Sequence, residues 1–288
     1  MTSNINNDLL DSFYWWIEER HKIYLRRLAG EPKPWTQDTI MQDYKFCNVF
    51  RELDTTTIWI KENIRDRWAD HPYLWFALCL ARRINLIDTM VDLDDLLVNW
   101  DAEKAHSILN NRKDSDKRIY NGAYMITTGG RKVPKNEDTC WNILEPLWAK
   151  REEITNTLKY INSIESAFYI FANGHVGYSN FLAYEIVTDM RHTKYLREAT
   201  DIYTWANAGP GAVRGLNRLH NRPLNSKIKS CQTNAEMQQL LIDSDLYLDN
   251  GFPVLEMRDI EHSLCEFDKY QRVGTDKSFL RQKYNGRG

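Results

Sequence analysis

The sequence has few cysteines, and none of them form a close pair. The five, at positions 47, 79, 140, 231 and 265, are dispersed through 288 residues without a C-x-x-C motif. An odd and scattered set argues against a disulfide framework, a zinc site or an iron–sulfur cluster, and it favours a reducing compartment. We therefore expect a cytoplasmic protein without a metal site.

Long apolar runs and nucleotide-binding signatures are also missing. The longest apolar run, Tyr73 to Ala81, is far shorter than the ~20 residues that cross a bilayer. The first residues are polar, so we expect no signal peptide and no membrane association. These residues contain neither G-x-x-x-x-G-K-[ST] nor H-x-E…C-x-x-C, which excludes a P-loop kinase and a zinc deaminase among them. A content of 42% hydrophobic and 27% charged residues is typical of a globular protein.

Charge is nearly balanced over the chain but not along it. The formal net charge is −2, so any contact with nucleic acid must come from a local basic surface. Residues 191–229 carry eight Lys and Arg against two acids, and residues 269–288 carry six against one. These stretches are either nucleic-acid surfaces or simply solvated basic faces.

The spacing of apolar residues is helical over most of the chain. Repeats of three and four predict helices over about 9–28, 46–64, 73–81, 101–111, 141–171, 179–190 and 253–272. The section 116–140, with its Gly129–Gly130 pair, predicts a short hairpin or a loop excursion. We therefore expect an all-α, two-lobed fold in which residues 1–272 form a single helical unit and 273–288 form a basic tail.

A helix-hairpin-helix is predicted over about 194–219. A basic helix over 194–207 would precede the turn Gly-Pro-Gly, and a second helix would run through Leu219. Glycine lets the backbone approach a phosphate, and the first N–H groups of the second helix bind it. A plain turn between two helices is the alternative. The candidate DNA-binding residues are Gly209, Gly211, Ala212, Arg214 and Arg218.

Many ionisable side chains lie on adjacent faces of the predicted helix 253–272. A carboxylate beside a histidine can act as a general base toward an amine or water. A surface helix stabilised by ion pairs is the alternative explanation. The candidate catalytic residues are Asp259, Glu261, His262, Asp268 and Lys269.

A third polar set lies near the N-terminus. Charged residues that face an aromatic-rich helix can bind an anion such as a diphosphate, although Arg27 or Arg51 can instead pair with Asp54. Asp189, at the end of an aromatic helix, is not explained by packing. The candidate substrate-binding residues are Arg20, His21, Tyr24, Arg27, Lys33, Trp35, Asn48, Arg51, Asp54 and Asp189.

Five segments together resemble one family. They are RHKIYLRRLAGEPKPWTQD, FCNVFRELDTTTIWI, GYSNFLAYEIVTD, AGPGAVRGLNRL and MRDIEHSLCEFDKYQR. The chain resembles the α-glutamyl/putrescinyl-thymine pyrophosphorylases, or amino acid:DNA transferases, of bacteriophage thymidine hypermodification. The helical module of phage 5-hydroxymethyl-deoxyuridine DNA kinases is similar. The resemblance implies a fold like that of helix-hairpin-helix DNA glycosylases, in which an essential aspartate follows the hairpin. Asp259 is the best match to that aspartate, and Asp268 is the second.

The resemblance also implies a reaction and its partners. An amino acid or polyamine would replace the pyrophosphate of pyrophosphorylated 5-hydroxymethyluracil in double-stranded DNA, after an upstream DNA kinase, in the cytoplasm of an infected bacterial cell. The flipped base would need an aromatic pocket, and no cofactor is expected. A glycosylase that excises a modified base and a non-catalytic DNA-binding module are the alternatives.

Overall fold

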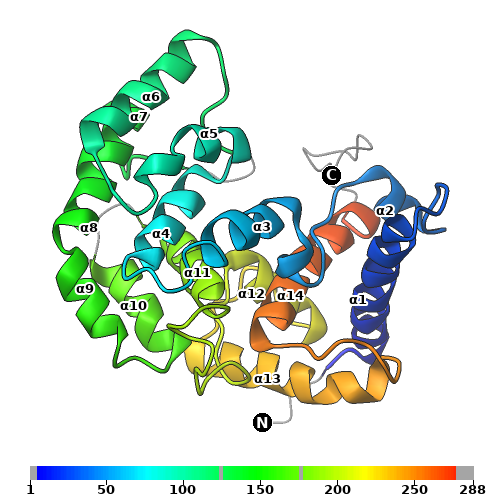
Figure 1. Cartoon of the computed structure of the whole chain (residues 1–288). Coiled ribbons are helices and arrows are strands. Elements are labelled where there is room, and N and C mark those ends of the chain that lie inside the picture. Colours follow the sequence, from blue (N-terminus) through cyan, green and yellow to red (C-terminus); the bar gives the residue numbers. More distant parts are fainter. Residues whose placement is uncertain (1–4, 123–125, 175–177, 277–288) are drawn as a thin grey trace. The chain divides into compact units, whose positions relative to one another are not determined.

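The regular elements of the described chain are all helices. The computed structural model describes residues 5–122, 126–174 and 178–276, and Figure 1 shows the course of the chain through them. The chain divides into two compact units. Unit 1 comprises residues 1–54 and 202–288, and unit 2 comprises residues 55–201. The expected all-α class is confirmed, whereas the function of residues 1–272 as a single catalytic unit stays a prediction.

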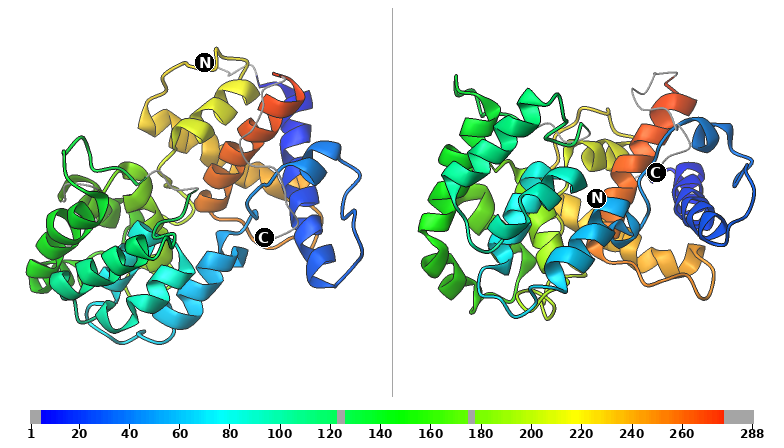
Figure 2. Two further views of the ribbon diagram at one scale, coloured as in Figure 1. Left: turned by 90° about the horizontal axis from the view of Figure 1, so that it is seen from above. Right: turned by 45° about the horizontal axis from the view of Figure 1, so that its top comes forward.

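Unit 1 is assembled from both ends of the chain. Its helices are α1 (Asn7–Leu28), α2 (Thr39–Asp43), η1 (Arg51–Leu53), α12 (Pro210–Leu219), α13 (Ser230–Tyr247) and α14 (Met257–Gly274). Both views of Figure 2 show α12, in yellow, alongside α14, in orange to red, and the two helices pack closely. Helix α1 packs against α12, α13 and α14. The polar segments that carry the candidate site are therefore held on a helical core.

The boundaries of α1 follow from its sequence. The Asn6 side chain accepts a hydrogen bond of 3.1 Å from Leu9 N at the N-terminus. Gly30, with φ +74°, stands just beyond the C-terminus. Phe13 and Ile17 belong to the buried face of the helix, as the apolar spacing predicts. The predicted helix 9–28 is thus confirmed.

Unit 2 surrounds one fully buried helix, α4. Every residue of α4 is buried, and α11 packs beside it in Figure 1. The helix ends at Asn85, which takes the left-handed conformation with φ 50°. The helices of unit 2 are α3 (Thr55–Ile60), η2 (Lys61–Arg65), α4 (Leu74–Ile84), α5 (Ile87–Asp92), η3 (Asp94–Leu96), α6 (Ala102–Asp114), α7 (Lys135–Glu137), η4 (Asp138–Leu144), α8 (Glu145–Ala149), α9 (Arg151–Leu158), α10 (Ile164–Gly174) and α11 (Asn180–Met190).

The expected first arm of the helix-hairpin-helix is wrong. Residues 191–204 form mostly turns and residues 205–209 have no regular secondary structure, so that no helix precedes α12 over 194–207. Side chains and backbone compete here, because Thr193 Oγ1 donates to Met190 O and accepts from Tyr195 N. The Lys194 ammonium donates to a backbone carbonyl outside the segment, at His71 O. Hydrogen bonds from side chains thus hold this segment in a conformation that is not helical.

Other expected helices differ in extent. Residues 46–50 are not helical, and helix returns only with η1 and α3. The Asn48 amide donates to Leu53 O and to the Asp54 carboxylate, which holds a turn in place of a helix. The predicted helix 141–171 is divided among η4, α8, α9 and α10. The described part of 116–140 is a loop that ends in α7 and η4, and residues 277–288 of the predicted tail lie outside the described residues.

Candidate functional site

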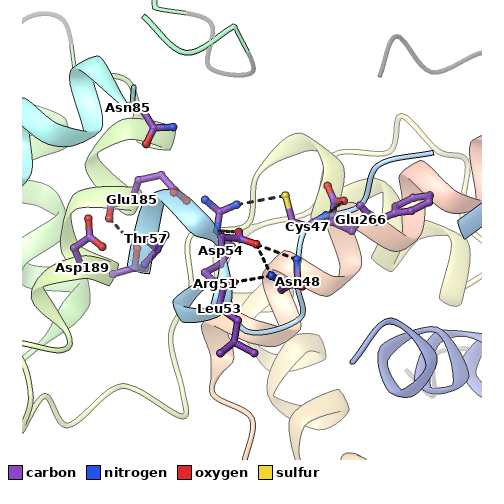
Figure 3. A network of polar contacts seen from close by, with 12 residues as sticks. Cys47, Asn48, Arg51, Leu53, Asp54, Thr57, Asn85, Glu185, Asp189 and Glu266 are labelled. Atoms are coloured by element: carbon purple, nitrogen blue, oxygen red, sulfur yellow. Dashed lines mark hydrogen bonds and ion pairs between the residues drawn. The ribbon is translucent and has the colours of Figure 1, made fainter. Parts of the chain in front are cut away.

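The segment between α2 and η1 forms the centre of a polar network in unit 1. Asn48 Nδ2 donates to Asp54 Oδ1 at 2.9 Å and to Leu53 O at 2.9 Å, and Asn48 N donates to Asp54 Oδ1 at 3.2 Å. Figure 3 shows these residues with their contacts dashed. One amide thus fixes the Asp54 carboxylate against the loop.

Arg20 reaches this loop from α1. Its Nη2 donates to Asn48 Oδ1 at 2.7 Å and to Phe46 O at 3.2 Å. Burial lowers the pKa of the Arg20 guanidinium, although Asp54 opposes this change. An arginine keeps its proton in proteins, so the loop receives a permanent positive charge from α1.

Arg51 supplies a second cation from η1. Its Nε lies 3.3 Å from Asp54 Oδ2, and its Nη1 donates to Cys47 Sγ at 3.7 Å. Burial raises the pKa of the Cys47 thiol to about 12. The thiol therefore stays protonated at neutral pH and is a poor nucleophile.

Helix α14 completes the network from the opposite side of the loop. Glu266 Oε2 accepts from Cys47 N at 2.9 Å and lies 3.2 Å from Lys269 Nζ. The Lys269 ammonium also donates to Lys45 O and lies 4.8 Å from the centre of the Phe46 ring. Three cations and two carboxylates now surround a single loop. We name this set, Arg20, Cys47, Asn48, Arg51, Asp54, Glu266 and Lys269, the loop network.

The other N-terminal candidates lie in different surroundings. His21 is buried in an aromatic cluster, with its ring 5.3 Å from Phe50 and 5.1 Å from Phe252 between centroids. Tyr24 stacks on it at 6.2 Å. Burial, reinforced by the charge of Arg20, lowers the pKa of His21, so its ring is neutral near pH 7. His21 and Tyr24 belong to a packed cluster beside the loop network.

The remaining N-terminal candidates lie toward the end of α1 and beyond it. Arg27 is exposed in the last turn of the helix. Lys33 follows in the turn after the helix, where its ammonium lies 5.0 Å from the centre of the Trp35 ring. Trp35 Nε1 donates to Glu31 O at 2.7 Å. Arg27, Lys33 and Trp35 thus lie apart from the loop network, although the sequence pattern places them in one set with Arg20 and Asn48.

Asp189 belongs to unit 2 and has a packing explanation after all. Its carboxylate accepts two hydrogen bonds from Arg82, at 2.6 Å from Nε and 2.7 Å from Nη2. Arg82 Nη2 also donates to Thr57 Oγ1 at 3.1 Å, and Glu185 Oε2 lies 3.8 Å from Nη1. Figure 3 labels the Thr57, Glu185 and Asp189 side chains. Asp189 and Arg82 form a buried bidentate pair that joins α11 to α4.

Two of the candidate carboxylates on α14 bind backbone N–H groups. Asp259 Oδ2 accepts from Glu256 N at 2.9 Å in a capping box at the start of the helix. Burial raises the pKa of Asp259 to about 7. Glu261 Oε1 accepts from Gly209 N at 3.1 Å, so this carboxylate lies at the N-terminus of α12, where a phosphate was predicted. His262 is buried on the same helix.

Gly211 and Gly215 of α12 serve helix packing. A Cβ added to Gly211 would lie 2.3 Å from Cys265 Sγ and 3.3 Å from Cys265 Cα. A Cβ on Gly215 would lie 2.6 Å from Leu264 O. Ala212, between them, is fully buried. Small residues at these positions allow α12 to lie directly against α14.

Asp268 links the same two helices by ion pairs. It is buried, and its carboxylate lies 2.8 Å from Arg214 Nε and 2.9 Å from Arg218 Nε. Arg218 also pairs with Asp276 at 2.6 Å. The Arg218 side chain is 9% exposed and that of Arg214 is 32% exposed. Both arginines therefore form ion pairs within unit 1. A DNA contact by either of them stays a prediction.

The structure thus brings together only part of each predicted set. Arg20, Asn48, Arg51, Asp54 and Lys269 meet in the loop network, which also includes two residues that were not candidates, Cys47 and Glu266. Glu266 lies one helical turn from both His262 and Lys269, so the helical spacing contained the signal for it. No comparable signal marked Cys47, because the pattern placed it in a helix.

No metal site and no membrane span occur among the described residues. Over residues 5–122, 126–174 and 178–276, no group of three or more His, Cys, Asp and Glu side chains is arranged to hold a metal ion. Within the same ranges, no helix combines the length and the apolar character required to cross a bilayer.

The loop network and the α12–α14 pair lie within a region that matches one family. Residues 7–278 match the family described as "5-hmdU DNA kinase, helical domain", and the chain belongs to this family. The chain is also similar to a 5-hmdU DNA kinase of Bacillus phage SP10, with 26% identity over 290 residues, which cover 91% of this chain and 45% of that protein. The chain therefore spans less than half the length of this relative. No solved structure matches this chain.

Proposed function

We propose that this chain is a DNA-modifying enzyme of phage thymidine hypermodification that replaces the pyrophosphate of a pyrophosphorylated 5-hydroxymethyluracil base with an amine. Membership of the kinase helical-domain family supports a role in phage DNA modification. The observation that carries the enzymatic proposal is the loop network, where Arg20, Arg51 and Lys269 surround one loop of unit 1.

The reaction needs positioning and charge neutralisation more than covalent catalysis. The amine nitrogen bonds to the methylene carbon at C5 of the base, and the bond from that carbon to the pyrophosphate oxygen breaks. Pyrophosphate leaves with the electron pair, and a base accepts the proton released by the amine. Cations held beside the leaving oxygens stabilise the charge that develops on them. Arg51 and Lys269, with 17% and 22% of their side chains exposed, are suited to this role.

A carboxylate of α14 is the proposed proton acceptor. Asp259 is suited to it because burial raises its pKa to about 7, and a base works best with a pKa near the operating pH. Glu266 is the other choice, since it lies within the loop network. Measurements of amine transfer and of DNA binding for Asp259→Asn and Glu266→Gln show which carboxylate accepts the proton. The variant of the carboxylate that accepts the proton should lose amine-transfer activity and keep its affinity for DNA within about threefold.

Mass spectrometry of nucleosides tests the proposed function. DNA that carries the pyrophosphorylated base is incubated with the purified chain and a mixture of amino acids and polyamines, and then digested. A new thymidine adduct with release of pyrophosphate supports the proposal and identifies the donor. Free base with abasic sites would show a glycosylase instead.

A second candidate is a non-catalytic helical module that holds DNA for a kinase. The observation in its favour is that the related kinase is more than twice as long as the matching region, while these 288 residues contain no P-loop motif. DNA that is bound by the chain but left unchanged in the same experiment would support this candidate.

A further inference from the structure

Unit 2 carries a strip of aromatic rings covered by arginines. In the turn before α4, the Arg67 guanidinium lies 4.8 Å from the centre of the Trp68 ring. At the junction of α8 and α9, the Arg151 guanidinium lies 4.9 Å from the Trp148 ring and 5.8 Å from the Tyr73 ring. Each of these two guanidinium groups thus lies over an indole ring, at a cation–π distance.

A continuous series of ring contacts joins the two layered pairs. The Trp68 and His71 centroids are 5.6 Å apart, those of His71 and Tyr73 are 5.5 Å apart, and those of Tyr73 and Trp148 are 5.0 Å apart. Each contact is edge to face, which is a preferred geometry for aromatic pairs. None of these rings is fully buried. We name Arg67, Trp68, His71, Tyr73, Trp148 and Arg151 the guanidinium–indole strip.

The start of the basic stretch 191–229 lies beside this strip. Lys194 Nζ donates to His71 O at 3.2 Å, and Tyr195 Oη donates to Pro72 O at 2.9 Å. Burial, reinforced by Lys194, lowers the pKa of His71, so the ring is neutral near pH 7. Lys194 is exposed. An ammonium therefore lies next to the rings at the edge of the strip.

Two of the three cations form no ion pair with a described carboxylate. Arg67 pairs with Asp94 at 2.6 Å, and the nearby Glu152 accepts from the Tyr73 hydroxyl. In the part of the chain that the structure describes, no carboxylate lies within ion-pair distance of Arg151 or Lys194. Arg151 donates to Trp148 O and also interacts with the Tyr73 hydroxyl, whereas Lys194 donates to His71 O and lies within the electrostatic influence of Asp70. Both keep the capacity to bind an external anion.

We propose that the guanidinium–indole strip, with Lys194, binds a strand of DNA whose bases are unstacked. A guanidinium that lies over an indole and is partly exposed can stack on a nucleobase, and unpaired bases are held in this way on aromatic rings and arginine planes. Lys194 contacts the backbone phosphate. The inference rests on the proposed function only in taking DNA as the substrate, since an enzyme that flips a base leaves neighbouring bases unstacked.

Fluorescence anisotropy of a labelled, unmodified single-stranded oligonucleotide tests the strip, with the full chain and a duplex of the same sequence for comparison. Arg151→Ala should weaken single-strand binding about 5- to 150-fold, which is the loss of one stacked base. Arg151→Lys keeps the charge but not the plane, so it should show most of the same loss. Lys194→Ala should reduce the salt slope by about one.

Matched controls separate the strip from general effects. Lys150→Ala removes the exposed cation next to Arg151, and Trp141→Ala removes an exposed indole elsewhere in unit 2. Both should bind the single strand as the wild type does, and all variants should keep the wild-type helical circular dichroism. Full affinity in Arg151→Lys, or a duplex bound as tightly as the single strand, would overturn the inference.

The unmodified probe makes the two proposals fail separately. If no adduct forms in the mass spectrometry but the strip variants lose single-strand affinity, the transferase is wrong and the strip stands. If adducts form and the strip variants bind like the wild type, the strip is wrong and the transferase stands.

Discussion

Gly215 of α12 and Leu264 of α14 approach so closely that a Cβ added to the glycine would lie 2.6 Å from the Leu264 carbonyl oxygen. The atom in the way belongs to the backbone of a buried helix, so it cannot move aside as a flexible side chain would. The contact fixes the distance between the two helices of unit 1 that carry most of the predicted DNA-binding and catalytic residues.

Gly215→Ala should therefore destabilise unit 1. Overpacking of this kind typically costs about 1–3 kcal/mol, and the midpoint of urea unfolding should fall accordingly. Gly122→Ala is the matched control, because a Cβ there meets nothing within 4 Å and the residue lacks a positive φ. Equal midpoints for the two variants would show that α12 shifts without cost.

Asp268→Asn should be strongly destabilising, although the residue was predicted to be catalytic. The buried carboxylate balances Arg214 and Arg218, and breaking a buried pair costs about 3–5 kcal/mol. Because Arg214 is partly exposed, we expect the lower end of that range in chemical denaturation. Asp276→Asn removes the partly exposed partner of Arg218 and should cost about 1 kcal/mol or less. A stable but inactive Asp268→Asn protein would restore the catalytic interpretation.

The stability contributed by Asp259 should depend on pH. Burial raises its pKa from the ordinary 3.8 to about 7, so between these values the folded protein binds a proton that the unfolded chain releases. Stability is therefore lost as pH rises from about 4 to about 7 and is level above that. Asp259→Asn cannot ionise and keeps an oxygen for Glu256 N, so its stability relative to wild type should rise across this interval.

Urea unfolding near pH 5 and near pH 8 measures this difference. Asp249→Asn, at a side chain that is 79% exposed, controls for the loss of an aspartate and should follow the wild type at both pH values. Parallel pH profiles for Asp259→Asn and wild type would show that the carboxyl group ionises normally in the folded chain.

Arg51→Lys should impair pyrophosphate displacement more than folding. The lysine keeps the charge but loses the planar guanidinium that contacts both Asp54 and Cys47, so we expect kcat/KM to fall on the order of tenfold or more. Arg118→Lys is the matched control, since Arg118 is an exposed arginine outside the loop network and outside the predicted sites. An equal loss in both variants would mean that the loop network does not hold the leaving group.

The sequence predicts helices well where one apolar face repeats. The residues of α1 and α14 follow that pattern, and both helices form close to their expected bounds. The pattern fails over 46–50, where the Asn48 side chain bonds to Leu53 O and Asp54 and replaces a helical turn. Apolar spacing records burial but not a polar side chain that captures its own backbone.

The candidate site is predicted only as a list of residue types. Arg20 and Asn48 are 28 positions apart, and the hydrogen bond between them depends on how the loop after α2 returns to α1. Gly209 and Gly211 were predicted to bind a phosphate, whereas their neighbours in the structure are Glu261 and Cys265. A sequence shows where a backbone needs space, but not what occupies that space.

The assembly of unit 1 from residues 1–54 and 202–288 has a consequence for the order of synthesis. Helix α1 is synthesised before α12, α13 and α14, the helices against which it packs. Unit 2, which is continuous in sequence, can complete its core while α1 still lacks its partners. The apolar face of α1 therefore remains without its native cover until α12, α13 and α14 have been made, and a chain truncated after residue 201 would contain all of unit 2 but only part of unit 1.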